Sequence, residues 1–151
     1  MLRERFTETL KSSMKEKNAR SVSTVRMILA KLKERDIEAR AKGNATGIPD
    51  AEIQQMLQGM VKQRRESVGL YEQGNRPELA QQEREEIAII EGFMPKQLDE
   101  AGTEAAVKAI IAEIGAAGPK DMGRIMAVLK ERHTGSIDMA LASATAKKLL
   151  S

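Results

Sequence analysis

The sequence predicts an all-α protein, and three observations lead to this prediction. Helix-forming residues dominate the 151 positions, above all Ala, Leu, Glu, Lys, Arg, Gln and Met. Apolar residues recur every three or four positions, which is the period of one helix face. Strand-like runs rich in Val, Thr and aromatic residues are missing, and only 2% of residues are aromatic. Aliphatic residues must therefore form the core, with the nine Met residues filling irregular gaps between helices.

Four helices are predicted in a first domain, residues 1–94. The first spans about Leu2–Lys17, and its apolar stripe consists of Leu2, Phe6, Leu10 and Met14. Asn18 and Ser21 allow a break and a new helix cap, so the second helix is expected over about Val22–Lys42. Its inner face consists of Val22, Val25, Ile28, Leu29 and Leu32. The segment 43–49, with two Gly and one Pro, is predicted to be a loop.

The third and fourth helices are predicted on either side of a turn at 74–77. The third begins at Pro49 or Asp50, and its apolar face consists of Ile53, Met56, Leu57, Met60, Val61, Val68 and Tyr71. The fourth begins near Glu78, and its stripe consists of Leu79, Ile87, Ile90 and Phe93. Because the residue before a proline is pushed out of the helical region, Pro95 is expected to end it.

A linker at residues 95–98 is predicted to lead into a second domain, residues 99–151, with three short helices. The first begins at Asp99 or Thr103 and buries Val107, Ile110, Ile111 and Ile114. Asp121 is predicted to cap the second helix, which ends at Gly135. Asp138 is predicted to cap the third.

Charged residues interrupt the apolar faces of the third and fourth helices. Arg64 takes an apolar position of the third, and Glu83 and Glu86 lie on the stripe of the fourth. Because an unpaired buried charge is costly, we expect Arg64 to form a structural ion pair with Glu83 or Glu86. The alternative is a cation site for phosphate or carboxylate.

Six cations stand out in the last 32 residues, where only three acids accompany them. They are Lys120, Arg124, Lys130, Arg132, Lys147 and Lys148. We predict that they contact nucleic-acid phosphates, which Lys and Arg bind without reading sequence. Small residues beside them are expected to give a smooth surface that a backbone could approach, namely Ala140, Ala142, Ser143, Ala144 and Ala146. The alternative is that these cations are simply solvated.

Charge is unevenly distributed although the formal net charge is only +3. Residues 11–42 contain ten Lys or Arg and four acids, whereas residues 72–91 contain two Arg and six Glu. Such asymmetry can steer an anionic partner. The alternative is that the two regions neutralise each other within one bundle.

The sequence lacks the residues that several classes of function require. There is no Cys, and the single His133 is expected at a helix end, so we predict no catalytic residue, no cofactor and no metal site. Nucleotide-binding and hydrolase motifs are missing. The charged N-terminus is no signal peptide, and no apolar run approaches the roughly 18 residues of a membrane span. We therefore expect a cytoplasmic protein.

The same blocks carry a family resemblance. The motif D-M-G-x-x-M at 121–126, a basic stretch ending in Gly135, and the final K-K-L-L resemble the tail domain of GatB, the B subunit of the tRNA-dependent amidotransferase. The order of blocks along the chain resembles the stand-alone YqeY-type proteins. The upstream blocks are V-R-M-I-L-A, K-Q-R-R-E-S, Y-E-Q-G-N-R-P-E-L and E-x-x-E-I-x-I-I-E-G-F-M-P-K-Q-L. The chain departs from the family in having F-M-P at 93–95 and in its loop at 43–48.

The resemblance implies a non-catalytic accessory protein that binds tRNA or aminoacyl-tRNA. A second interpretation is a protein-protein adaptor that docks on an amidotransferase or an aminoacyl-tRNA synthetase. A third, which we favour least, is part of a carbon-nitrogen ligase with glutamine as amido-N-donor, because the chain lacks the length for that family's catalytic domain.

Overall fold

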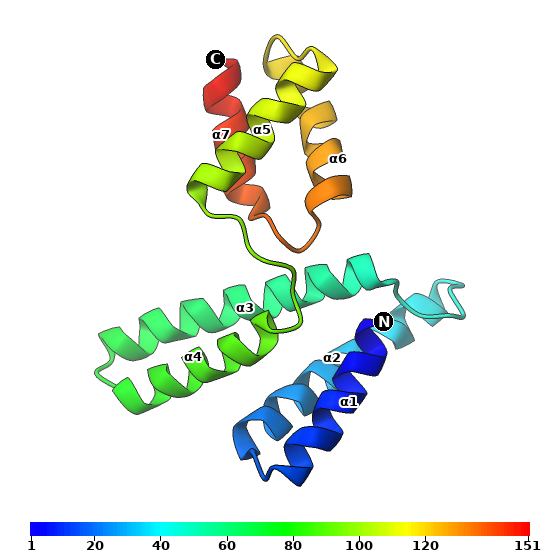
Figure 1. The fold of residues 1–151 in the computed structure, drawn as a ribbon, viewed down its shortest axis with the longest axis vertical. Helices are drawn as coiled ribbons and strands as arrows, with labels where there is room; N and C mark the ends of the chain where they lie inside the picture. Colours follow the sequence, from blue (N-terminus) through cyan, green and yellow to red (C-terminus); the bar gives the residue numbers. More distant parts are fainter. The chain divides into compact units, whose positions relative to one another are not determined.

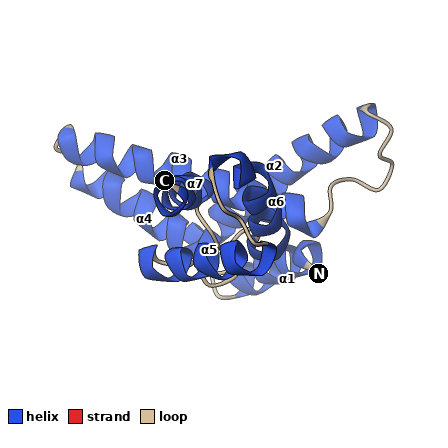
Figure 2. Ribbon diagram, turned by 90° about the horizontal axis from the view of Figure 1, so that it is seen from above, coloured by secondary structure: helices blue, strands red, loops and turns tan.

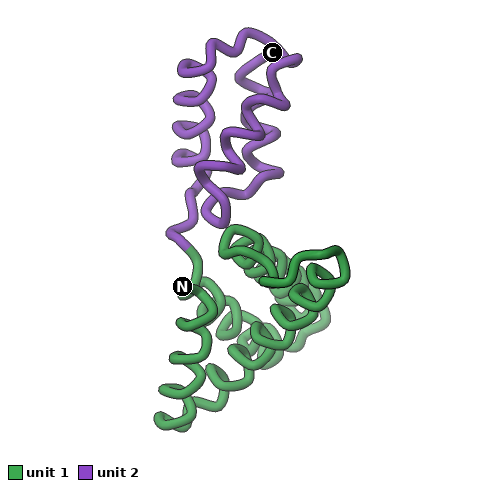
Figure 3. Tube along the Cα trace, turned by 90° about the vertical axis from the view of Figure 1, so that its right-hand side faces the viewer, with its two compact units in different colours: residues 1–94 green, residues 95–151 purple.

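The computed structural model describes residues 1–151, and all of its regular elements are helices joined by loops (Figures 1 and 2). The all-α prediction is confirmed. Contacts along the chain divide it into two compact units, which Figure 3 colours separately. Unit 1 comprises residues 1–94 and unit 2 comprises residues 95–151. Each has a hydrophobic core of its own.

Unit 1 is built from two helical hairpins. Its elements are α1 (Leu2–Lys15), α2 (Ala19–Ala41), α3 (Asp50–Gln73) and α4 (Pro77–Glu91). Helix α1 packs on α2, α3 lies along α4, and α2 also packs on α4 (Figure 1). The largest fully buried side chains of this core are Phe6, Ile28, Ile53, Leu57 and Ile90. Burying them is the main driving force that holds the hairpins together.

The first two helices differ from the prediction at their junction. Helix α2 begins at Ala19 rather than near Val22, because the Asn18 side chain accepts a hydrogen bond from the Ser21 amide at 3.1 Å. The expected stripe of α1 is wrong at Met14, which is 52% exposed, while Ser13 is buried. A four-residue repeat rotates by about 40° at each step of a 3.6-residue helix, so the stripe has left the buried face by its fourth member.

The end of α4 also differs from the prediction. The helix ends at Glu91, before it reaches Pro95. The Gly92 amide still donates to the Ala88 carbonyl, but the Phe93 and Met94 amides donate to the carbonyls of Ile90 and Glu91. The chain has therefore left the α-helical hydrogen-bond pattern before Pro95, so the proline does not end the helix. Beyond the helix Phe93 is buried and meets Phe6 edge to face, with 4.9 Å between ring centroids. The Arg5 guanidinium lies 5.4 Å from the Phe93 ring centroid and donates to the Gly92 carbonyl at 3.0 Å. The turn that follows α4 therefore packs against α1 through Arg5 and Phe6.

Unit 2 packs one long helix against two shorter ones. Its elements are α5 (Glu100–Ile114), the 3-10 helix η1 (Pro119–Asp121), α6 (Met122–His133) and α7 (Met139–Leu150). The Asp99 carboxylate accepts from the Gly102 amide at 2.7 Å, so α5 begins after Asp99, the first of the two expected starts. Asp138 accepts from the first amides of α7, so its expected cap is confirmed. The Leu98 amide donates to the Ser136 carbonyl at 2.8 Å, which ties residue 98 to this unit.

Two expectations for unit 2 are wrong. The Asp121 side chain does not cap α6. It accepts instead from the Ala117 and Gly118 amides, because η1 continues into α6 and leaves the carboxylate facing back toward the loop. Ala142 and Ala146 are fully buried in the core, so they form no smooth outer surface.

Candidate nucleic-acid interface

The six predicted cations all lie on the surface of unit 2. Lys120 is in η1, α6 carries Arg124, Lys130 and Arg132, and α7 carries Lys147 and Lys148. Every one of these residues is exposed. Exposure therefore leaves all six side chains accessible to an anion. They differ in whether a carboxylate or carbonyl of the same unit already binds them.

Arg132 is occupied by a carboxylate from α5. Its two terminal nitrogens each lie 2.6 Å from an oxygen of Glu113, which makes the pair bidentate. The hydrogen bonds from Arg132 hold the pKa of Glu113 below its usual range. Both side chains are about half exposed, so the pair is screened by solvent and can open. A phosphate would have to compete with Glu113 for this arginine.

Arg124 has a structural task at the junction of α5 and α6. Its Nη1 lies 3.2 Å from Asp121 Oδ1, and its Nη2 donates to the Ile114 carbonyl at 3.1 Å. The hydrogen bond from the Ala117 amide is the main reason that the pKa of the Asp121 carboxyl is lowered, and the positive charge of Arg124 lowers this pKa further. Arg124 thus stabilises the end of α5 and is less available to an external anion than its exposure suggests.

The other four cations form no ion pair or side-chain hydrogen bond. They are Lys120, Lys130, Lys147 and Lys148. Lys147 and Lys148 are neighbours on α7, where consecutive side chains point about 100° apart. Each of these four ammonium groups is accessible to a phosphate. The hydrogen bond from Lys108 lowers the pKa of the Glu104 carboxyl, and the charge of Lys148 also contributes to that shift.

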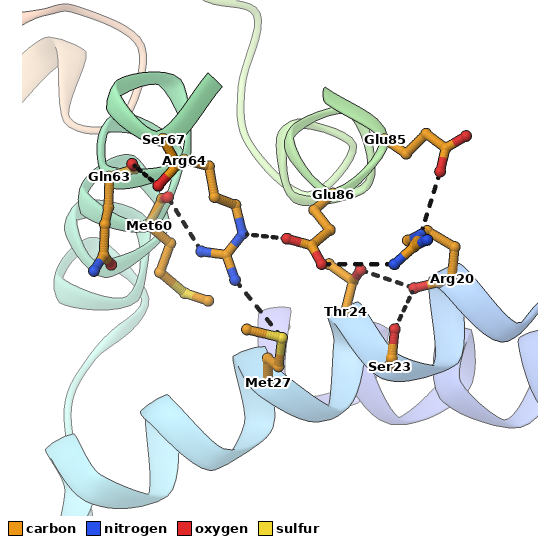
Figure 4. Close-up of polar contacts among 10 residues, drawn as sticks. All are labelled: Arg20, Ser23, Thr24, Met27, Met60, Gln63, Arg64, Ser67, Glu85 and Glu86. Atoms are coloured by element: carbon orange, nitrogen blue, oxygen red, sulfur yellow. Dashed lines mark hydrogen bonds and ion pairs between the residues drawn. The ribbon is translucent and has the colours of Figure 1, made fainter. Parts of the chain in front are cut away.

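The charged residues inside unit 1 form a different kind of site, an internal ion-pair network (Figure 4). Nε of Arg64 on α3 lies 3.1 Å from Oε2 of Glu86 on α4, and both side chains are more than nine-tenths buried. Nη1 of Arg64 donates to the Met60 carbonyl at 3.2 Å, and Nη2 lies 3.7 Å from Met27 Sδ on α2. Because its nitrogens face protein acceptors in a buried site, this geometry favours the structural interpretation over a site for an external anion.

Helix α2 joins the same network through an arginine that the sequence pattern did not single out. Nη1 of Arg20 lies 3.9 Å from Glu86 Oε1, and its Nε donates to Glu85 at 3.2 Å. Glu86 therefore lies between two guanidinium groups from two helices. Glu83 makes no ion pair, and burial together with the nearby charge of Glu86 raises its pKa.

The arrangement of helices, cations and buried ion pairs can be compared with known families. A model of the Yqey-like proteins matches residues 3–150. The chain belongs to the YqeY-like family. The match covers both units, and so it includes the exposed cations and the buried network of this YqeY-like chain. Comparison with curated proteins gave no match.

The helices and the acidic side chains of this YqeY-like chain were also compared with what a membrane span and a metal site require. None of its helices combines the length and the apolar character that spanning a membrane requires. No three acidic or His side chains come together as a metal-binding group.

Sequence reasoning missed Arg20 and Glu113, the residues that decide which charges are paired. Both are charged positions on helix surfaces, where pattern reasoning gives the same interpretation for a paired and a free side chain. Only the packing of α2 on α4, and of α5 on α6, brings the partners together.

Proposed function

We propose that this YqeY-like chain is a non-catalytic accessory protein that binds tRNA or aminoacyl-tRNA through unit 2. The observation that carries the proposal is the set of four exposed, unpaired lysines on that unit. The resemblance of its last 31 residues to the GatB tail supports a tRNA ligand. Family membership is compatible with this ligand and does not name it.

The lysines favour binding led by charge and shape. Unit 2 contains no aromatic residue on which a base could stack, because both Phe and the single Tyr lie before residue 95. Folded tRNA presents a rigid double-helical surface whose phosphates can be contacted without unstacking bases. Binding should accordingly be moderate, tolerant of tRNA sequence and strongly dependent on salt.

The test is tRNA binding by the full chain, measured by fluorescence anisotropy over a series of salt concentrations. The test variant is the double change Lys130→Glu and Lys147→Glu, since neither lysine has a partner whose removal would disturb the fold. Affinity should fall, and the slope of log K against log salt should flatten by about 0.7 to 0.9 for each phosphate that the variant no longer neutralises.

A matched control reverses two exposed lysines of unit 1, Lys15 and Lys33. This control has the same change in net charge, so it separates a local interaction from a general decrease in attraction. If the control weakens tRNA binding more than the unit 2 variant does, the proposed interface is wrong.

A further inference from the structure

The outer face of α2 has a pattern of its own, separate from the unit 2 cations. Inner-face residues such as Val25, Ile28 and Leu32 are buried in the core of unit 1. Outside this core a row of exposed residues recurs at alternating spacings of four and three, which is a heptad pattern. We call this row the outer seam, and it consists of Ser23, Met27, Ala30, Glu34, Ile37 and Ala41.

The outer seam combines small residues with two large exposed apolar ones. Met27 is 45% exposed and Ile37 is 55% exposed, which makes them two of the five large apolar side chains left open to solvent in the whole chain. Met27 lies at the edge of the seam nearest α3, because its Sδ is 3.7 Å from Arg64 Nη2, so Ile37 is the large apolar residue of the seam that is free of the core of unit 1. Ala30 and Ala41 would let a second backbone approach closely. The row covers 18 residue steps, or about 27 Å at 1.5 Å per residue.

One flank of the outer seam is uniformly basic. Arg26, Lys33 and Arg40 occur every seven residues, at the heptad position that borders such a seam, and all three are exposed. None of them forms an ion pair or a side-chain hydrogen bond. The other flank carries Thr24, which is buried, Lys31, which pairs with Glu34 of the seam at 3.5 Å, and Glu38, which is exposed. The surface is thus a strip of small and apolar residues that is bordered on one side by unpaired positive charge.

We propose that the outer face of α2 is a docking surface for an acidic amphipathic helix of another protein. Apolar side chains of that helix would cover Ile37 and the exposed part of Met27, and its flanking carboxylates would face Arg26, Lys33 and Arg40. A second copy of this chain fits poorly. An antiparallel pair places the two basic rows against each other. A parallel pair places Arg26 against Lys31 and Lys33 against Glu38, so repulsion at one position offsets attraction at the other and charge gives such a pair no net stabilisation. The proposal shares no residue with the tRNA interface and does not rest on it.

Nucleic acid is the competing occupant, and the apolar residues distinguish the two. Phosphates would use the basic row, but they gain nothing from Ile37, whereas a helix partner needs both features. The probes are two synthetic three-heptad peptides with Leu at the seam positions. One carries Glu at both flanking positions and the other carries Lys. Like charges on each peptide oppose its self-association.

Binding to the full chain is measured by fluorescence anisotropy with labelled peptides. The acidic peptide should bind about ten-fold more tightly than the basic one, since three rim charges each contribute roughly two- to three-fold. The triple change Arg26→Glu, Lys33→Glu and Arg40→Glu should invert that preference. Ile37→Asp should weaken the acidic peptide by about ten-fold. The control Lys147→Glu with Lys148→Glu should leave peptide binding unchanged.

The same proteins are titrated with folded tRNA, and circular dichroism melting confirms that each variant keeps the fold. Equal affinity for the two peptides, or no inversion by the triple change, overturns the proposal. It is also overturned if the triple change abolishes tRNA binding while Ile37→Asp affects neither ligand, because the surface is then a phosphate site. A dimer that Ile37→Asp dissociates would assign the seam to a second copy and overturn it as well.

Discussion

Arg64 and Glu86 face each other from α3 and α4, with Nε 3.1 Å from Oε2 in a site where both side chains are buried. The sequence pattern offered two partners for this arginine, and the structure places Glu86, not Glu83, at hydrogen-bond distance. Arg20 approaches the other oxygen of Glu86 from α2. One carboxylate therefore connects three helices of unit 1.

Arg64→Met should lower the free energy of unfolding by about 3 kcal/mol, because it leaves Glu86 buried with only the more distant Arg20 as a partner. Adding Glu86→Gln should recover part of this stability by removing the uncompensated charge. Denaturant unfolding measures both. Arg65→Met is the control, since Arg65 is 62% exposed in its pair with Glu91. An unchanged midpoint for Arg64→Met would contradict the role of the pair.

Glu83→Gln should stabilise unit 1 at neutral pH, on the order of 0.5 kcal/mol, the scale of a surface substitution. The pKa of Glu83 is raised in the folded state by burial and by the charge of Glu86. The folded state therefore binds this proton more tightly than the unfolded state, so the stability it contributes is present at low pH and is lost as pH rises through the folded pKa.

Thermal unfolding at pH 4 and pH 7 checks this prediction. The advantage of Glu83→Gln should be present at pH 7 and shrink toward pH 4. A variant that is less stable than the parent at pH 7 would show that Glu83 has a favourable partner.

Gly47→Ala should destabilise unit 1 by more than about 2 kcal/mol, whereas Gly43→Ala should cost only about 1 to 2 kcal/mol. Both glycines have positive φ, +85° at Gly47 and +95° at Gly43. An added Cβ at Gly47 would lie 2.4 Å from Asp36 Oδ1, while at Gly43 it meets nothing within 4 Å. The difference between the two variants in urea unfolding isolates the steric effect from backbone strain.

The Asp36 carboxylate occupies the space that a side chain at position 47 would need, and its own hydrogen bonds hold it there. Arg3 donates to both of its oxygens, at 2.6 and 2.9 Å, and the Ile48 amide donates to Oδ1 at 2.9 Å. These hydrogen bonds, with that of Arg3 first, lower the pKa of Asp36 to about 2. Equal destabilisation by the two Gly→Ala variants would mean that Asp36 moves aside freely.

Glu113→Gln should raise tRNA affinity by about two- to three-fold if unit 2 binds tRNA as proposed. Removing the carboxylate charge weakens the bidentate hold on Arg132 and adds one available cation to the four unpaired lysines. Anisotropy titration at low salt measures the change. Glu100→Gln is the control, because it removes an exposed carboxylate of the same unit that forms no ion pair. Equal gains from both variants would indicate a general charge effect.

A fragment spanning residues 95–151 should remain helical on its own. It keeps the seven-residue buried core of unit 2 and the hydrogen bond from Leu98 to Ser136. At this size the fragment should be only marginally stable. Circular dichroism with thermal melting checks it, and a coil spectrum at low temperature would contradict independent folding. Independent folding of unit 2 stays a prediction until then.

Local sequence determined where most helices are and how they begin. Apolar periodicity located the helices, and short polar caps such as Asp99 and Asp138 marked starts that the structure confirms. These features depend on residues within one or two turns, so they can be read without knowing the fold. The prediction that Met14 is buried with the rest of the α1 stripe was wrong, because a repeat of four does not match a helical turn of 3.6 residues.

Only the tertiary structure decided which charges are available. Arg124, Arg132 and Lys147 look alike in sequence, as cations on helices, and for Arg64 the sequence left the partner open between two glutamates. Helix packing buries Arg64 against Glu86 and joins Arg132 to Glu113, 19 residues away, while Lys147 keeps no partner. The energy of a charge depends on its burial and on carboxylates within a few ångströms, and both are set by segments distant in sequence. For that reason the sequence could nominate a cationic surface but could not say which members of it are free.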